Sequence, residues 1–417
     1  MRVFKFGGAS VKDANGVKNV ARVLQEVGHD DVFLVVSAMG KMTNAFEVLT
    51  QAYCNGEAEL ASQFEVIKRY HHTIIEDLFE DNKARIRNKI EVYFAEIASF
   101  FSENTSKDYD YIYDQLVSKA ELISTTIVSR YLAHIGIANT WIDVRDYIQT
   151  NTDYRDAKVD WKQTESLISD GIVKNGTLYI TQGFLGRSNM GSTTTLGREG
   201  SDYTAGIFAY CLDAESVSIW KDVEGVLNAD PRHFEQTQLL EQISYTEAIE
   251  LAFYGASVIH PKTLQPLQKK EIPLYVKSFV NPKNQGTSVS RGLHLFPEMP
   301  CFIVKKNQIL LSISSLDFSF IVERNISDIF RLLHQYKMKV NMIQNSAISF
   351  SVCLDDKYHN FDLLLNDLKA TFKIDFFREV SLYTIRHFTK DAIASLENGN
   401  TVLLKQLNQE TVQMVIE

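Results

Sequence analysis

The chain is poor in the residues that build disulfide frameworks and zinc sites. Its 417 residues include only four cysteines, Cys54, Cys211, Cys301 and Cys353, and each stands alone. No C-x-x-C pair and no mixed Cys/His ligand spacing occurs, so the common zinc motifs are absent. We therefore expect reduced thiols in a cytoplasmic protein, with no metal held by a dedicated protein site.

Long apolar runs and concentrations of positive charge are also missing. No stretch reaches the roughly 18 to 20 apolar residues of a membrane-spanning helix, and the N-terminus enters a strand pattern without a signal-peptide pattern. The formal net charge is −9, and no basic stripe is present. Neither a membrane nor a nucleic acid is therefore an expected partner, and any anionic ligand must be held by local positive groups.

What is present is an ordinary globular composition with 45% hydrophobic and 23% charged residues. Strand and helix patterns alternate over the first ~280 residues, which predicts an α/β fold with a largely parallel sheet sandwiched by helices. The expected strands are Val3–Phe6, Asp31–Met39, Asn139–Val144, Leu178–Thr181, Val217–Trp220 and Ile272–Lys277. A long helical pattern fills residues 57–130, and residues 281–300, rich in Pro, Gly, Asn and Ser, predict a linker with one short strand.

The pattern changes after this linker. A strand, a helix, two strands, a helix and a further strand region follow, which is the βαββαβ order of a ferredoxin-like unit. Their expected bounds are Gln308–Ser315, Ile326–Tyr336, Lys339–Gln344, Ala347–Leu354, Tyr358–Thr371 and Phe372–Thr384. Residues 390–417 predict a short helix and two strands, too little for a complete second copy.

The stretch TTTLGREGSDYTAG, Thr193–Gly206, carries the richest chemistry. Its glycines allow close backbone approach to an anion, and the expected helix from Asp202 to Leu212 offers N–H donors at its start. Arg198 can bind a carboxylate or phosphate through two parallel hydrogen bonds. A plain Ser/Asp helix cap beside an arginine would give the same pattern, so this loop alone does not establish an anion-binding site.

A second glycine-rich loop opens the chain. In MRVFKFGGASVKD a strand runs into Gly7 and Gly8 and then into a helical pattern, the arrangement of a phosphate cradle. Lys5 is placed to project toward the same anion, although a solvated lysine at a strand edge would give the same sequence pattern. Neither G-x-x-x-x-G-K-[ST] nor G-x-G-x-x-G occurs, so the loop is not a Walker A or Rossmann fingerprint.

Six ordered motifs together resemble the aspartate kinase family, whose members have the amino acid kinase fold. They are KFGGAS (Lys5–Ser10), VVSAMGKMTN (Val35–Asn44), ITQGFLG (Ile180–Gly186), TTTLGREGSDYTA (Thr193–Ala205), WKDVEGVLNADPR (Trp220–Arg232) and YGASVIHPKTLQPL (Tyr254–Leu267). The βαββαβ unit looks like an ACT domain, the amino-acid-sensing module of that family. The resemblance runs through the whole chain.

This resemblance implies a domain organisation and a set of partners. It places an amino acid kinase domain at 1–283, a linker with the first strand of a partial ACT unit at 284–305, an ACT domain at 306–376 and a shortened second ACT-like unit at 377–417. It also implies a homodimer formed through the ACT region, with lysine or threonine as effector.

The activity implied is ATP-dependent phosphorylation of the side-chain carboxylate of L-aspartate, giving 4-phospho-L-aspartate. This is the first step toward lysine, threonine, methionine and isoleucine. Mg²⁺ is the default cation for bound ATP. In such a reaction the protein mainly positions the reactants and neutralises charge.

The resemblance also assigns roles to individual residues. Lys5 bridges the transferred phosphate and the attacking carboxylate, and Asp202 organises that lysine. Arg198 binds a substrate carboxylate and Glu121 the substrate ammonium, while Ser37, Thr43 and Ser201 line the same pocket. ATP is expected at Lys5, Gly7, Gly8, Trp220, Lys221, Asp222, Asp230 and Arg232.

Several positions depart from the family pattern. Glu199 stands where many relatives have glycine, and we expect its side chain to point outward while its charge weakens ATP binding. Ser257 replaces a nucleotide-contacting lysine of many relatives, for which Lys221 could compensate. The segment SLDFSFIVERNISDIF lacks the effector-loop glycine, and the second ACT unit is short, which both argue against feedback inhibition. Asn341–Ser346 keeps the pattern of an effector-and-dimer strand, although an ordinary amphipathic strand would share it.

Two other functions remain open from the residues alone. One is a related amino acid kinase acting on glutamate or another carboxylate, against which Glu121, Arg198 and the ACT unit argue. The other is a catalytically weak ACT protein that senses amino acids. Retained Lys5 and Asp202 argue against that second function.

Overall fold

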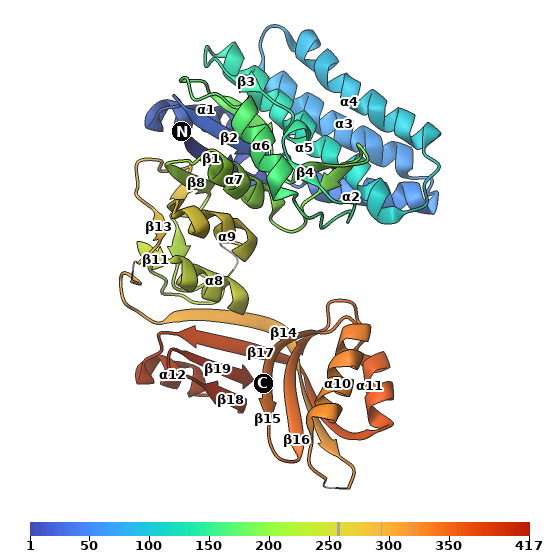
Figure 1. Cartoon of the computed structure of the whole chain (residues 1–417), viewed down its shortest axis with the longest axis vertical. Helices are drawn as coiled ribbons and strands as arrows, with labels where there is room; N and C mark the ends of the chain where they lie inside the picture. Colours follow the sequence, from blue (N-terminus) through green and yellow to red (C-terminus); the bar gives the residue numbers. More distant parts are fainter. Residues whose placement is uncertain (257–258, 293, 318) are drawn as a thin grey trace. The chain divides into compact units, whose positions relative to one another are not determined.

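The computed structural model describes residues 1–256, 259–292, 294–317 and 319–417. The chain forms two compact units (Figure 1). The first contains residues 1–226, 239–249 and 258–294, and the second contains residues 227–238, 250–257 and 295–417.

The first unit is built on an eight-stranded sheet in the order β11–β13–β12–β8–β1–β2–β5–β3. Its strands are β1 (Arg2–Phe6), β2 (Val32–Val36), β3 (Thr140–Trp141), β5 (Tyr179–Gln182), β8 (Ser216–Lys221), β11 (Gln242–Ser244), β12 (Leu274–Ser278) and β13 (Thr287–Ser290). The described pairs are parallel, apart from the antiparallel pair β12–β13. The largely parallel sheet expected from the alternating pattern is confirmed.

Helices surround this sheet, and the long α3, α4 and α5 lie side by side (Figure 1). The α-helices of this part of the chain are α1 (Ala14–Val27), α2 (Met42–Asn55), α3 (Leu60–Leu78), α4 (Lys83–Glu103), α5 (Tyr109–His134), α6 (Trp161–Gly171), α7 (Gly200–Cys211), α8 (Tyr245–Tyr254) and α9 (Pro261–Lys270). Two short 3-10 helices, η1 (Gly8–Val11) and η2 (Val144–Asp146), follow strand ends. The helical pattern expected over residues 57–130 is therefore three consecutive helices.

Strand β1 shows how the sequence positions the site. Phe4 and Phe6 point to one face of the eight-stranded sheet and belong to the hydrophobic core that this face forms with α1 to α5. Successive side chains of a strand point to opposite faces, so Lys5 points to the other face. There it meets Asp202 in the first turn of α7. A strand buried on both faces thus carries one lysine, at the position where α7 offers a carboxylate.

The strand expected at Asn139–Val144 is shorter than predicted. Only Thr140–Trp141 pairs with β5, because the Asp143 side chain accepts a hydrogen bond from the backbone N–H of Arg145 and starts η2. Aspartate commonly competes in this way with sheet pairing. The short strands β4 (Gln149–Thr150), β6 (Leu185–Ser188) and β7 (Thr193–Thr195) form a separate three-stranded sheet.

The predicted linker contains the expected short strand, β13. It lies in the eight-stranded sheet, paired with β12 and β11. The boundary placed at residue 283 therefore precedes the last strand of that sheet. The strands β9 (Val226–Leu227) and β10 (Leu239–Leu240) have two residues each.

The second unit is an antiparallel sheet in the order β15–β16–β14–β17–β19–β18. Its elements are β14 (Cys301–Ser315), α10 (Glu323–Gln335), β15 (Lys339–Asn345), β16 (Ser349–Asp355), α11 (Phe361–Lys369), β17 (Phe372–Arg386), α12 (Lys390–Glu397), β18 (Val402–Leu407) and β19 (Thr411–Ile416). The order from β14 to β17 is the predicted βαββαβ, which confirms the ferredoxin-like class.

The two long strands β14 and β17 are shared by two halves of this sheet. Their register shifts between Lys305 and Leu310, where Asn307 and Glu379 adopt positive φ angles of 56° and 57°. On one side of the shift, α10 and α11 cover the sheet. On the other side, α12 packs against β17 and β19. The second half of this sheet thus has a single described helix, as the short C-terminal pattern predicts.

Candidate active site

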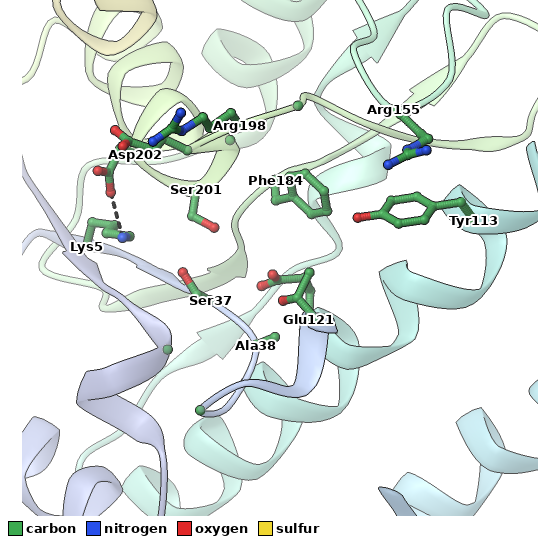
Figure 2. Close-up of a pocket in the computed structure, with 16 residues that line it drawn as sticks. Lys5, Ser37, Ala38, Tyr113, Glu121, Arg155, Phe184, Arg198, Ser201 and Asp202 are labelled. Carbon is green, nitrogen blue, oxygen red and sulfur yellow. Dashed lines mark ion pairs between the residues drawn. The ribbon is translucent and has the colours of Figure 1, made fainter. Parts of the chain in front are cut away.

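A cavity of about 440 Å³ opens at the carboxyl ends of β1, β2 and β5 (Figure 2). Open parallel sheets bind ligands at this edge. Its walls are formed by Lys5, Gly8, Ser37, Ala38, Gly40, Thr43, Tyr113, Glu121, Arg155, Phe184, Gly197, Arg198, Glu199, Gly200, Ser201 and Asp202. The cavity therefore gathers the predicted catalytic pair and every predicted substrate-binding residue.

Lys5 and Asp202 form an ion pair of 2.6 Å between Nζ and Oδ1. Both side chains are nearly buried, with Lys5 9% exposed. Asp202 lies in the first turn of α7, where a carboxylate is favoured by the helix dipole. The pair holds the lysine ammonium at a fixed point of the cavity wall.

The glycines after β1 leave room for this ammonium and for a ligand. A Cβ at Gly7 would stand 3.2 Å from the Lys5 Nζ, and one at Gly8 would stand 2.6 Å from the Gly40 carbonyl oxygen. Gly40 also donates its N–H to the Gly8 carbonyl at 3.0 Å. Side chains at Gly7 and Gly8 would therefore crowd the lysine and push the two loops apart.

Glu121 lies on α5 and is 3% exposed. Burial raises the pKa of its carboxyl to about 8, while a hydrogen bond from the Ala38 backbone and the charge of Lys5 act in the opposite direction. Its Oε2 has no hydrogen-bond partner in the described part of the chain. A buried carboxyl with a free oxygen is suited to receive a cationic group of a ligand.

Because Glu121 is buried, we expect the folding stability of the unliganded protein to depend on pH. Between the ordinary carboxyl pKa of 4.5 and about 8, the folded protein binds more protons than the unfolded chain, so its stability falls as pH rises through that window. We expect Glu121→Gln to raise the melting temperature at pH 8 by several degrees and to have less effect at pH 5. Differential scanning fluorimetry without ligands measures this, and a lower melting temperature at pH 8 would contradict it.

The remaining predicted substrate residues also lie on the wall. Ser37 follows β2, and its carbonyl accepts a hydrogen bond of 2.7 Å from Ser124 of α5. Thr43 stands in the first turn of α2 and Ser201 in that of α7. Arg198 is exposed, and its guanidinium forms no ion pair within the described residues, so it is available to an anion.

Glu199 corrects an expectation. Its side chain does not point outward: it lines the cavity, and its Oε2 is buried without a hydrogen-bond partner among the described residues. The reason is the backbone, which is left-handed at this position with a φ of 54°. Such a conformation suits glycine and costs other residues about 1–2 kcal/mol. The charge of Glu199 acts on Lys221 and His260, whose pKa values it raises against the larger lowering by burial.

The sequence did not single out Tyr113, Arg155 and Phe184, which also line the cavity. The Arg155 guanidinium lies 4.4 Å from the centre of the Tyr113 ring, and burial raises the pKa of Tyr113 to about 12. Tyr113 precedes Glu121 by eight residues on α5, a spacing close to two helical turns. Helical periodicity from Glu121 could have found it, whereas Arg155, on an irregular turn, gives no such signal.

Three predicted nucleotide residues lie on or just after β8. Trp220 is 1% exposed, and its ring stacks on Phe6 at 5.9 Å, so its indole belongs to the core. Lys221 is close enough to Asp202 and Lys5 for their charges to act on it, and burial lowers its pKa. Asp222 lines a separate hollow with Ser10 and other residues of η1 and α1. Their part in nucleotide binding stays a prediction.

Asp230 and Arg232 lie in the second unit and pair with each other. The Arg232 Nε and Nη2 atoms lie 3.0 and 2.6 Å from the Asp230 carboxylate oxygens, and these hydrogen bonds lower the pKa of Asp230 to about 2. The predicted nucleotide contacts of both residues stay predictions. Ser257 lies outside the described residues.

Two general features complete the description. Within the described ranges, no group of three or more His, Cys, Asp and Glu side chains is placed to hold a metal ion. None of the described helices has both the length and the apolar character needed to cross a bilayer.

Comparisons with known proteins identify the family of the chain. Residues 1–278 match the model of the amino acid kinase family. The lysine-sensitive aspartokinase 3 of Escherichia coli is 33% identical over 357 residues, which cover 85% of this chain and 78% of that protein. A crystal structure of E. coli aspartokinase III with lysine and aspartate superposes with a TM-score of 0.84 at 29% identity, covering 100% of this chain and 95% of the other. The complex of the same enzyme with aspartate and ADP gives a TM-score of 0.82 at 28% identity, covering 100% and 96%.

The fold and the cavity thus define a member of the amino acid kinase family. Within it, the identity and coverage place the chain in the aspartokinase family.

Proposed function

We propose that the protein is an aspartate kinase, which transfers the γ-phosphoryl group of ATP to the side-chain carboxylate of L-aspartate. The observation that carries this proposal is the meeting of Lys5, Asp202, Glu121 and Arg198 in one cavity. Aspartate has two carboxylates and one ammonium. Lys5 and Arg198 are the cations that can bind the two carboxylates, and Glu121 is the carboxyl that can bind the ammonium.

The chemistry follows from this placement. Arg198 binds the α-carboxylate and Glu121 the ammonium, so the side-chain carboxylate is directed to the Lys5 end of the cavity. An oxygen of that carboxylate attacks the γ-phosphorus, the bond to the β,γ-bridging oxygen breaks, and ADP leaves. Lys5 neutralises charge on the reacting oxygens, while Asp202 holds its ammonium in place.

Magnesium fits such a site without a dedicated protein cage. Mg²⁺ keeps most of its water ligands and is commonly held by substrate phosphates with one or two carboxylates. Asp202 is the carboxylate on the cavity wall that is best placed for this role. The ion would supply charge neutralisation at the ATP phosphates.

Lysine and a second copy of the chain are the proposed regulatory partners. A related enzyme has been solved with lysine bound. Strand β15 is one of the two outer strands of the six-stranded sheet, the other being β18, and its Ile343 is 40% exposed. A second chain that pairs there would cover that edge. Light scattering with and without lysine or threonine tests both the dimer and the effector.

Glu199 supports a quantitative prediction about the nucleotide. Glu199→Gly relieves the left-handed backbone and removes a negative charge near Lys221. We expect the KM for ATP to fall several-fold and the melting temperature to rise by a few degrees. Glu199→Gln removes only the charge and is the matched control. A higher KM for ATP in both variants would show that Glu199 assists nucleotide binding.

The proposed function is tested by ATP turnover with different acceptors. L-aspartate, L-glutamate and N-acetylglutamate are compared in an assay coupled to ADP release. We expect turnover with aspartate that exceeds the others by at least about 100-fold. Preferred turnover of another carboxylate would assign the chain to a different activity within the same fold, and no turnover in a folded protein that binds aspartate would favour an amino-acid sensor.

A further inference from the structure

Asp114 is a buried carboxylate that the proposed mechanism does not use. It lies on α5, seven residues before Glu121, and it is 0% exposed. It does not line the cavity. A buried carboxylate costs free energy unless its oxygens receive hydrogen bonds, so its partners indicate what it is for.

Three donors from two other segments surround Asp114. Its Oδ2 accepts hydrogen bonds from the backbone N–H groups of Thr195, at 2.8 Å, and Arg155, at 3.1 Å. Its Oδ1 accepts one from the Thr195 hydroxyl at 2.7 Å. One side chain of α5 therefore fastens both the end of β7 and the turn that carries Arg155.

Both fastened segments lead directly into the cavity. Thr195 is the last residue of β7 and stands three positions before Arg198. Arg155 lines the cavity with a left-handed φ of 67°, a conformation that needs support from its surroundings. The helix itself carries Tyr113 and Glu121. Asp114 thus ties together α5, which carries Glu121, the turn that carries Arg155, and the strand that leads to Arg198.

The charges around Asp114 show that it is not merely one half of an ion pair. Burial raises the pKa of its carboxyl to about 6, against the lowering by the Thr195 and Arg155 hydrogen bonds and by the Arg155 charge. The Arg155 guanidinium itself turns to Asp110, at 3.2 Å, and Glu47, at 3.5 Å. Asp114 therefore acts mainly on backbone groups.

We infer that Asp114 is a positioning residue of the active site: it holds Arg155 and the approach to Arg198 against α5, and so sets the affinity for aspartate. This inference rests on the proposed function. It predicts an effect on the KM for aspartate that is larger than the effects on kcat and on the KM for ATP.

Two substitutions at this position separate hydrogen bonding from charge. In Asp114→Asn the amide oxygen can accept both backbone N–H groups, and the NH₂ group can donate to the Thr195 hydroxyl. All three contacts are kept in weaker, uncharged form. In Asp114→Ala all three are lost, and two backbone N–H groups are left buried.

The expected results differ between the variants. Asp114→Ala raises the KM for aspartate at least about tenfold, with kcat within about threefold. Asp114→Asn raises that KM about threefold or less. Below pH 6 the KM for aspartate of wild type should approach that of Asp114→Asn, because the wild-type carboxyl becomes protonated and then resembles the amide. Ser129→Ala is the matched control, because Ser129 is also buried on α5 but bonds Asn139, which does not line the cavity.

The outcomes distinguish the inference from the function on which it rests. If wild type neither binds nor phosphorylates aspartate, the proposed function fails. If wild type is active and folded Asp114→Ala keeps the wild-type KM for aspartate, or loses kcat and both affinities alike, the positioning role is wrong. If Asp114→Ala does not fold, Thr195→Val tests the positioning role instead, because it removes only the hydroxyl contact to Asp114. We expect it to raise the KM for aspartate about two- to threefold. An unchanged KM for aspartate would overturn the inference.

Discussion

Lys5→Ala is expected to lower kcat by two to three decades, which corresponds to roughly 3–4 kcal/mol of transition-state stabilisation. The lysine ammonium is fixed by Asp202 at 2.6 Å in a largely buried wall, so its charge acts on the reacting oxygens with little screening by water. The substitution also leaves Asp202 buried without its counter-ion. Steady-state kinetics with saturating ATP and aspartate measure the loss.

The control for this prediction is another lysine of the same sheet. Lys277 lies on β12, is half-buried and does not line the cavity. Lys277→Ala should keep kcat within about twofold, whereas circular dichroism should show both variants folded. If Lys5→Ala retained wild-type kcat, Lys5 could not be the group that stabilises the transferring phosphoryl group.

Glu121→Gln is expected to lower kcat/KM for aspartate by about 100-fold or more. The ammonium of bound aspartate would face a neutral amide in a nearly dry site, and breaking a buried charge pair costs about 3–5 kcal/mol. One oxygen of Glu121 has no hydrogen-bond partner among the described residues, and the proposed mechanism assigns this position to the ammonium. Kinetics at pH 8.5, where the wild-type carboxyl is mostly ionised, measure the full effect.

A ligand without the amino group supplies the control for Glu121. Succinate has both carboxylates of aspartate but no ammonium, so its inhibition constant should be no weaker in Glu121→Gln than in wild type. An equal loss of affinity for aspartate and succinate would show that the substitution disturbs the cavity as a whole. The assignment of Glu121 to the ammonium would then be wrong.

The sequence predicted the parts of this protein that depend on local pattern. Strand and helix periodicity identified the parallel sheet and the βαββαβ unit, because buried strands and amphipathic helices differ in their spacing of apolar residues. Two of the six motifs carry Lys5, Arg198 and Asp202, and the family resemblance added Glu121, which lies in none of them. Glu121 shows the limit of prediction from local sequence, since a glutamate in a helical pattern gives no indication by itself that it is buried.

What the sequence could not predict depends on backbone conformation and on contacts between distant segments. The side chain of Glu199 turns into the cavity because its backbone is left-handed, and composition does not reveal that angle. The contacts of Asp114 join residues 41 and 81 positions apart, beyond the reach of any local pattern. The strand β13 was read as part of a linker because its pairing partners, β11 and β12, lie outside the segment.

The most direct test of the proposed reaction is the identity of the phosphorylated product. The protein is incubated with ATP, Mg²⁺ and L-aspartate, the acyl phosphate is trapped with hydroxylamine, and the hydroxamate is identified by mass spectrometry and by comparison with α- and β-aspartyl hydroxamate standards. The account predicts the β-hydroxamate, formed in wild type and reduced by two to three decades in Lys5→Ala. An α-hydroxamate, or no hydroxamate from folded protein that binds both substrates, would contradict it.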